Sequence, residues 1–346
     1  MRGSLSKAEG GIVAADRITI TEVAKLANTS TATVSHYLNG KFEKMSASTR
    51  ESIRRTIEQT GYVPGIQARS LAGKPTGIIA VLILDNTNLW AGQICSGIEG
   101  VATSAGFQTV VCNSNFSATR EKSYVEKMLS LGVDGFIIQP TTHFRDINMR
   151  ITSAGKPVVF YDCDTFDFRT SWVKSNLYNG MYAAITECID RGYERFVFAG
   201  SNVDNRSRQE RFSGFSDAVS ARDLTYETVT IGHVAPSADE LAKWFMLHLN
   251  TARRTLVCVP NQWALDRVYQ ALMRQRQLVP DRVGLLGMNN ANWAHLTSPS
   301  ISTIVEPVYE EGVLACQMLL DMMSERTASA RQEILDCTTR WLETTR

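Results

Sequence analysis

The sequence of 346 residues lacks any run of apolar residues that approaches the ~18 required for a transmembrane helix. Its first segment, MRGSLSKAEGGIVAADR, also lacks the apolar core of about 7–15 residues that a secretory signal needs. The seven cysteines are widely scattered, without a C-x-x-C pair or a Cys/His cluster, which argues against a structural zinc and a disulfide framework. We therefore expect a reduced, cytoplasmic protein with no membrane partner.

Signatures of catalysis are also missing. The sequence has no glycine-rich phosphate loop, no metal-ligand cluster and no Ser/His/Asp arrangement. Its five histidines fall in unrelated segments without the spacing of metal ligands. We expect a protein that is not an enzyme and that uses no cofactor or metal. A sugar-metabolising enzyme or a solute-binding protein with an accessory head is the alternative from a different class, and the missing secretory signal argues against the second.

The net charge of +1 hides an uneven distribution along the chain. Residues 1–75 carry eleven Lys/Arg and six Asp/Glu, a net charge of +5, whereas residues 76–346 carry twenty-five and twenty-nine, a net charge of −4. The chain is also long enough for two or three domains. A small basic head on a larger acidic body indicates a polyanionic partner for the head alone.

Two short amphipathic segments near the N-terminus predict a helix-turn-helix. In ITITEVAKLA, apolar residues recur at helical spacing, and Thr21 is the expected N-cap. In TATVSHYLNG, Val34 and Leu38 form an apolar pair one turn apart. Between them, Asn28 suits the left-handed backbone of a tight turn. Two helices separated by about three turn residues, each with a narrow apolar face, are typical of this motif.

A third helix is expected within MSASTRESIRRTIEQTGY. Its cap is either Ser48, in a capping box with Glu51, or Ser46, and Gly61 ends it. The following segment, GIQARSLAGKPTG, is bracketed by proline and glycine and has modest helical propensity. We interpret it as a hinge helix that orders on DNA, with Leu71 as an apolar wedge in the minor groove, and a flexible linker is the alternative.

The second helix of the pair has an outward face of Thr31, Ala32, Ser35 and His36, almost without charge. Acidic side chains there would be repelled by phosphate, whereas hydroxyl, methyl and imidazole groups suit base edges in the major groove. Lys41, Lys44, Arg50, Arg54 and Arg55 are expected to contact phosphates. The residues predicted to contact DNA are Thr21, Thr31, Ala32, Thr33, Ser35, His36, Asn39 and Arg50 in the head, and Arg69, Leu71, Ala72 and Lys74 in the hinge.

The segments ITEVAKLA, STATVSHYLNG, STRESI, GYVP and ARSLAGK together resemble the N-terminal signature of the lactose/galactose repressor (LacI/GalR) family. The resemblance extends over nearly the whole chain, with NTS in the turn where the family usually has GVS. It implies a nucleoid-associated regulator that binds double-stranded operator DNA as a homodimer, with a tetramer as the alternative. Its affinity for DNA is then set by a small effector.

From residue 77 onward, apolar strand-like runs alternate with helical segments, which predicts parallel sheets covered on both faces. The expected fold is therefore a small all-α helix-turn-helix head and an α/β body of two doubly wound lobes, which by resemblance are similar to periplasmic binding proteins. The expected divisions are a tail over 1–16, the head over 17–63, the hinge over 64–76 and the effector-binding and dimerisation domain over 77–346, with an N-lobe of about 77–174 and 308–335 and a C-lobe of about 175–304 and 336–346.

Ligands of such folds lie at the carboxyl ends of the strands, so the polar residues that follow each strand are candidates for the effector site. The resemblance implies ligand-binding positions at Asp162, Arg211, Asn261 and Asn289. Gln139 and Trp90 are expected to face the same crevice, and Trp172 is a weaker candidate. For Trp90, a place in the core is the alternative.

The family commonly has aspartate where Asn289 stands, and aspartate near Asn261. Amides at these places, beside Arg211, reduce repulsion against an anionic ligand. We therefore predict a repressor that is released by a sugar acid. The segments YLNGKFEKMS and RQERFSGF also resemble repressors of 2-keto-3-deoxygluconate and hexuronate catabolism. The alternative effector is a neutral sugar or a nucleobase, and co-repression is the alternative to release.

Overall fold

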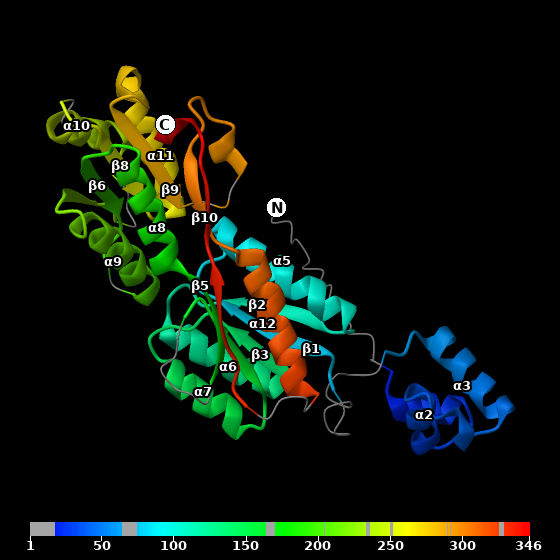
Figure 1. The fold of residues 1–346 in the computed structure, drawn as a ribbon. Coiled ribbons are helices and arrows are strands. Elements are labelled where there is room, and N and C mark those ends of the chain that lie inside the picture. The colour runs from blue at the N-terminus through cyan, green and yellow to red at the C-terminus, as the bar shows by residue number, and fades with distance from the viewer. Residues whose placement is uncertain are drawn as a thin grey trace, which may run out of the picture. The chain divides into compact units, whose positions relative to one another are not determined.

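The computed structural model describes residues 18–63, 75–163, 170–203, 205–232, 236–249, 252–288, 290, 292–324 and 329–346. The chain divides into two compact units, Met1–Lys74 and Pro75–Arg346, and each is described by itself (Figure 1). Within the described ranges, no helix combines the length and the apolar character needed to cross a membrane.

The first unit is built from helices α1 (Ile20–Leu26), α2 (Thr31–Leu38) and α3 (Ala47–Thr60), with a 3-10 turn η1 (Phe42–Lys44) before α3. Val23, Val34 and Ile53, one from each helix, are fully buried and form its small core. Asn28 has a φ of 49° in the turn between α1 and α2, so the predicted left-handed turn is confirmed. Gly61 ends α3 with a φ of 61°, also as predicted.

The caps of these helices correct one prediction and decide another. Thr19, not Thr21, is the N-cap of α1: its side chain accepts from the Glu22 backbone N–H, and the Glu22 carboxylate accepts in return from the Thr19 backbone N–H at 2.6 Å. Thr21 lies inside the helix because the capping box starts two residues earlier. Ser46 caps α3 by accepting from the Thr49 N–H at 3.1 Å, which decides between the two alternatives.

The body contains two sheets of six strands. One sheet has the order β11-β5-β4-β3-β1-β2 and is parallel throughout, and the other has the order β12-β10-β9-β8-β6-β7, with only β12 antiparallel to its neighbour. The strands of the first sheet are β1 (Ile78–Ile83), β2 (Gln108–Asn113), β3 (Gly135–Ile138), β4 (Val158–Tyr161), β5 (Ser171–Asn176) and β11 (Gln332–Asp336). Those of the second are β6 (Arg195–Gly200), β7 (Thr225–Thr230), β8 (Thr255–Val259), β9 (Val283–Met288), β10 (Ser302–Val305) and β12 (Thr338–Arg340). The chain therefore crosses between the sheets three times: after β5, after β10 and between β11 and β12.

Helices cover both faces of each sheet. The first lobe has α5 (Leu89–Ser104), α6 (Ala118–Leu131), α7 (Phe144–Ser153) and α12 (Val308–Met323). The second has α8 (Leu177–Asp190), α9 (Arg206–Ser220), α10 (Ala238–His248) and α11 (Gln262–Leu272), with the 3-10 segments η2 (Met273–Leu278), η3 (Asn292–His295) and η4 (Glu343–Thr345). The fold predicted from the alternation of strands and helices is thus confirmed.

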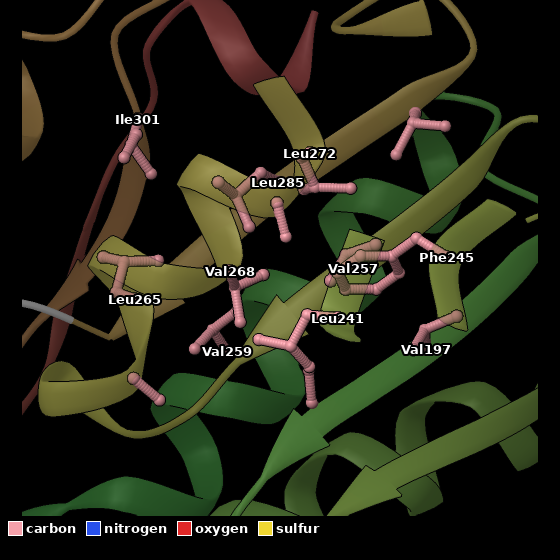
Figure 2. Packing of buried hydrophobic residues seen from close by; sticks show 14 of the residues in the cluster. Val197, Leu241, Phe245, Val257, Val259, Leu265, Val268, Leu272, Leu285 and Ile301 are labelled. Atoms are coloured by element: carbon pink, nitrogen blue, oxygen red, sulfur yellow. The ribbon is translucent and has the colours of Figure 1, made fainter. Parts of the chain in front are cut away.

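Each lobe has two apolar clusters, one on each face of its sheet. In the second lobe, Val257 and Leu285 from the central strands pack against Leu241 and Phe245 of α10 and Val268 of α11 (Figure 2). Burial on both faces explains why these strands are unbroken Val/Ile/Leu runs instead of alternating ones. The rigid sheets hold the ends of the strands, and the polar residues that follow them, in fixed positions.

Candidate functional sites

The outward face of α2 is the candidate site in the first unit. Ser30 caps the helix by accepting from the Thr33 N–H at 3.1 Å, and its hydroxyl also contacts the Thr33 hydroxyl at 2.8 Å. Thr31 and Ala32 are exposed beside this N-terminus, while Ser35 and His36 are half-buried. The N-terminal turn of α2 therefore presents small, uncharged side chains together with helix N–H groups, a surface that suits close approach to polar base edges and phosphate.

Two of the predicted DNA contacts have internal partners. The Asn39 side chain donates to the Ser35 carbonyl at 2.6 Å and to the Ser35 hydroxyl at 3.3 Å, which closes the C-terminal end of α2. Arg50 stacks over the Phe42 ring, with 3.8 Å from its guanidinium carbon to the ring centroid. This stacking holds the Arg50 guanidinium, near the N-terminal end of α3, against the Phe42 ring, and its positive charge can still attract an anion.

Arg54 and Arg55, expected to contact phosphates, pair with acidic residues of their own helix. Arg54 contacts Glu51 and Glu58 at 2.6 Å each, and Arg55 contacts Glu51 at 2.9 Å. These side chains are largely exposed, and such ion pairs contribute little to stability. The hinge residues Arg69, Leu71, Ala72 and Lys74 lie outside the described residues.

The candidate site of the body is a cavity of about 310 Å³ whose walls come from both lobes. Four of its polar residues follow strand ends: Asp85 after β1, Gln139 after β3, Asp162 after β4 and Glu306 after β10. Its volume lies at the lower end of the ~300–1,000 Å³ typical of small-molecule sites. The residues lining the cavity are Leu84, Asp85, Thr87, Asn88, Trp90, Phe116, Gln139, Asp162, Asn205, Ser207, Arg208, Arg211, Asn261, Gln262, Trp263 and Glu306.

Five residues expected at the effector site line this cavity: Trp90, Gln139, Asp162, Arg211 and Asn261. The weaker candidate, Trp172, does not, and its expected place there is corrected. It lies on β5, where it is 7% exposed and packs with Phe136 and Phe160 in a core cluster of the first lobe. Successive residues of a strand point to opposite faces of the sheet, and Trp172 points into the core. Asn289 lies outside the described residues.

Asp162 connects the two lobes at the cavity wall. Its carboxylate accepts from Gln139 Nε2 at 2.8 Å in its own lobe and from Ser207 Oγ of α9 at 3.1 Å in the other. Its backbone has a φ of 52°, so the chain turns sharply at the end of β4. Burial raises the pKa of Asp162 to about 6, and the nearby Glu306 charge adds to this, against the opposing effects of Arg211, Gln139 and Ser207. Asp162 is thus a hydroxyl acceptor whose pKa lies above that of an ordinary aspartate.

Arg211 and Glu306 form a buried ion pair in the cavity. Arg211 Nη2 lies 3.2 Å from Glu306 Oε1, and the two side chains are only 15% and 6% exposed. Arg211 Nη1 also donates to the Pro260 carbonyl at 3.1 Å. On the other side, Trp90 Nε1 donates to Glu306 Oε2 at 3.2 Å, and the Trp90 ring stacks on Tyr161. Trp90 therefore belongs both to the core of the first lobe and to the cavity wall, so the two alternatives are not exclusive.

Glu306 was not among the predicted site residues. Its backbone is fixed by Asn290, whose Oδ1 accepts from the Glu306 N–H at 3.1 Å and whose Nδ2 donates to the Glu306 carbonyl at 2.6 Å. The signal for it was present in the sequence, because Glu306 directly follows the strand-like segment ISTIV, which is rich in β-branched residues, as Asp162 follows VVFY. Ser207 and Arg208 were also missed, since they belong to the first turns of α9 and follow no strand directly.

Asn261 has a partly structural role. It is 5% exposed, and its Oδ1 accepts from the Ser201 backbone N–H at 2.9 Å, which ties the loop after β6 to the start of α11. Within the described residues, no three His, Cys, Asp or Glu side chains form a group able to hold a metal. The cavity therefore offers hydrogen-bond donors and acceptors, one buried ion pair and aromatic surface, a set that suits the binding of a small polar molecule.

The comparisons with known proteins agree with this architecture. Residues 19–65 match the model described as "Bacterial regulatory proteins, lacI family", and residues 185–343 match "Periplasmic binding protein-like domain". A probable HTH-type transcriptional regulator, EndR of Paenibacillus polymyxa, is 26% identical over 313 residues, which cover 89% of this chain and 91% of that regulator.

Two solved structures share the fold. The lac repressor dimer bound to operator and the anti-inducer ONPF has a TM-score of 0.80 at 20% identity, with 95% of this chain and 99% of that one covered. The transcriptional regulator CelR in complex with cellobiose has a TM-score of 0.67 at 21% identity, with 95% and 100% covered.

A helix-turn-helix head joined to a two-lobed body of the periplasmic-binding-protein type, with a polar cavity between the lobes, defines a DNA-binding, ligand-responsive regulator of transcription. The head is similar to the LacI family of bacterial regulatory proteins, and the chain resembles transcriptional regulators of this kind over most of its length.

Proposed function

We propose that the protein is a repressor that binds a near-palindromic operator as a homodimer and is released when a small sugar-type effector occupies the cavity between the lobes. The single observation that carries the effector response is the composition of the cavity wall. Asp162 of the first lobe accepts a hydrogen bond from Ser207 of α9 in the second, and Glu306, on the crossover that follows β10, pairs with Arg211 of α9. A ligand that competes for these groups changes how the lobes are joined.

Operator recognition is assigned to the outward face of α2. Thr31, Ala32 and His36 are proposed to face base edges, and Ser35, half-buried and bound by Asn39, is placed nearer to phosphate. Arg50 is proposed to position the head on the DNA backbone. The hinge is proposed to span residues 64–76, with Arg69, Leu71, Ala72 and Lys74 in or beside the minor groove.

The sugar-acid effector predicted from the sequence stays a proposal, as does the kinship with repressors of 2-keto-3-deoxygluconate and hexuronate catabolism. Arg208 and Arg211 both line the cavity and are the groups that would bind a carboxylate. For this binding mode, the effector must compete with Glu306 for Arg211, because that carboxylate already lies 3.2 Å away.

A neutral sugar is the second candidate, and Glu306 is the observation that favours it. Arg211 is paired with Glu306, and the carboxylates of Asp85 and Asp162 also line the cavity, so its wall has no excess of positive charge. Carboxylates accept hydrogen bonds from sugar hydroxyls without needing a charged ligand. The neutral cellobiose bound by the CelR regulator agrees with this candidate. Of the two classes, the described charges favour the neutral one.

The experiment that separates these proposals is an operator-binding titration. The operator is first selected from random DNA with the full-length protein, and fluorescence anisotropy then measures operator affinity with added D-glucose, D-galactose, D-glucuronate or D-gluconate. Release by the neutral sugars alone supports the neutral class, and release by the acids alone supports the sugar acid. Tighter operator binding in the presence of a ligand would replace induction with co-repression. If the selection yields no enriched sequence, the proposed function is wrong.

The assignment of α2 is tested on the same selected operator. Exchange of Ala32 and His36 for larger polar side chains should change which operator variant is preferred, by about 1–3 kcal/mol at the bases concerned. Arg50→Ala should instead weaken all operator variants about equally and reduce the salt dependence of binding. If the Ala32 and His36 variants weaken every operator equally, these residues do not contact bases.

A further inference from the structure

A carboxylate lies fully buried directly behind the cavity wall. Glu311, in the first turn of α12, is 0% exposed, and it does not line the cavity. Its Oε1 accepts from the Asp162 backbone N–H at 2.9 Å, and its Oε2 accepts from the Ser175 hydroxyl of β5 at 3.0 Å. Burial of a carboxyl group is costly unless hydrogen bonds compensate it, and here each oxygen has a donor. One of these two donors is the backbone of a cavity residue.

The contact occurs where the backbone of Asp162 needs support. Asp162 has a φ of 52°, a conformation that side-chain-bearing residues adopt uncommonly, and its N–H also donates to the Val173 carbonyl at 3.1 Å. Glu311 thus holds the residue at the turn, while Gln139 and Ser207 hold its carboxylate. The orientation of Asp162 toward a ligand depends on all three.

The position of Glu311 is itself fixed by close packing of α12 on α5 (Figure 1). A Cβ on Gly312 would lie 2.3 Å from the Ile94 carbonyl oxygen, and a Cβ on Gly97 would lie 2.2 Å from the Tyr309 carbonyl oxygen. The two helices therefore touch backbone to backbone next to Glu311. Movement of α12 relative to β4 would carry the carboxylate away from Asp162.

Glu306 lies five residues earlier, on the same crossover. It pairs with Arg211 of α9, so the short segment from Glu306 to Glu311 contacts the cavity at two places. The two contacts are with different lobes: Arg211 belongs to the second lobe and Asp162 to the first. One crossover segment is thereby attached to both sides of the cavity.

The titratable groups around Glu311 come from several elements. The groups that interact electrostatically with Glu311 are Asp162, Tyr161, Glu306 of the crossover and Cys337 between β11 and β12. Arg211 interacts in turn with Asp162 and Cys337. Lys174, next to Ser175 on β5, pairs instead with Glu210 of α9. Burial, and then the Asp162 charge, raise the pKa of Glu311 well above its ordinary value. The carboxyl group therefore holds its proton at a pH where an exposed glutamate has lost it.

We propose that Glu311 is a positioning residue of the effector site: from the crossover helix it fixes the backbone of Asp162, and its protonation state is transmitted to that residue. The proposal rests on the proposed function of the cavity for its consequence, because Asp162 must bind the effector for the coupling to alter affinity. The contact itself requires no effector. Loss of the carboxylate should leave the Asp162 N–H with only the Val173 carbonyl as its acceptor and loosen the peptide group, and replacement by an amide should keep it in place without the titration.

The test is the amide resonance of Asp162 in the ligand-free, full-length protein labelled with ¹⁵N-aspartate, followed over the whole pH range in which the protein stays folded. Asp162→Asn identifies the resonance by removing it. In the unmodified protein, we expect the amide shift to move with the titration of Glu311 as well as with that of Asp162. Glu311→Gln should remove the Glu311 part of the profile and keep the amide protected from hydrogen exchange, whereas Glu311→Leu should also reduce that protection, because only the Val173 carbonyl then accepts from the Asp162 N–H. Glu310→Gln, a change at the exposed neighbouring glutamate, is the matched control and should leave the profile unchanged.

An Asp162 amide that behaves identically in the unmodified protein, in Glu311→Gln and in Glu311→Leu overturns the proposal. Because no ligand is present, this result is independent of whether the cavity binds an effector. If the amide behaves as expected but none of the four sugar probes changes operator affinity, the positioning of Asp162 stands and the proposed effector class fails. If Glu311→Leu does not fold, the comparison of Glu311→Gln with Glu310→Gln decides alone.

Discussion

The pair of Arg211 and Glu306 supports a quantitative prediction about the stability of the body. Two unit charges 3.2 Å apart attract by about 5 kcal/mol at an effective dielectric constant of about 20. Water in the cavity and the cost of desolvating both groups reduce this value, and we expect a coupling energy of about 2 kcal/mol. Arg211→Met should destabilise the protein by about 3 kcal/mol, because it leaves Glu306 buried with Trp90 Nε1 as its side-chain donor.

The double-mutant cycle of Arg211→Met and Glu306→Gln measures this coupling. Glu306→Gln keeps the shape and an acceptor oxygen, so the double variant should be less destabilised than the sum of the single ones. The assay is equilibrium urea unfolding of the full-length chain, followed by circular dichroism. It is made at one fixed protein concentration, because association would otherwise change the apparent stability.

Arg206→Met is the matched control on the same helix. Its side chain is 46% exposed and 3.6 Å from Glu210, so it should change stability by less than about 1 kcal/mol. Single effects that add within about 0.5 kcal/mol would refute the coupling.

Two further perturbations test the site and the head. The pKa of Asp162 is raised on folding, so the native state binds a proton more tightly than the unfolded state does. The unmodified protein should therefore lose up to about 3 kcal/mol of stability as the pH rises from about 4 to about 6. Asp162→Asn should flatten this part of the dependence of unfolding free energy on pH, and an unchanged dependence would show that Asp162 does not titrate in this range. Thr19→Ala should destabilise the head by about 1 kcal/mol through loss of the capping box, whereas Thr21→Ala should have little effect; thermal unfolding that ranks the two variants in the opposite order would contradict the assigned cap.

The fold could be predicted well from the sequence because its main signals are local. Unbroken apolar strands alternating with helices define doubly wound sheets, and the Val34 and Leu38 pair defines the buried face of α2. The cap of α1 lies two residues before the predicted one. Thr19 and Thr21 are both near the start of the apolar pattern, and only the two hydrogen bonds between Thr19 and Glu22 distinguish them. Such shifts of one or two residues at helix ends are not resolved by periodicity alone.

The candidate site could be predicted only in part. Asp162 and Gln139 follow strands, and the ends of parallel strands meet at one edge of a sheet, so their shared place was predictable. Trp172 could not be assigned correctly, because its face of β5 depends on the register with β4 and β11. Glu311 lies 149 residues from Asp162 in the sequence, and a glutamate in the first turn of a helix is ordinarily interpreted as an exposed residue. Only the packing of α12 brings it under the cavity.

The central claim, that occupancy of the cavity controls DNA binding, is tested most directly by one comparison. Operator affinity is measured by fluorescence anisotropy with and without a saturating concentration of the active sugar probe, in the unmodified protein and in Arg211→Met. We predict that the ligand weakens operator binding of the unmodified protein about 5- to 150-fold, the usual range of allosteric coupling, and that the variant loses most of this response while still binding the operator. A probe shown to bind in the cavity that leaves operator affinity unchanged would contradict the account.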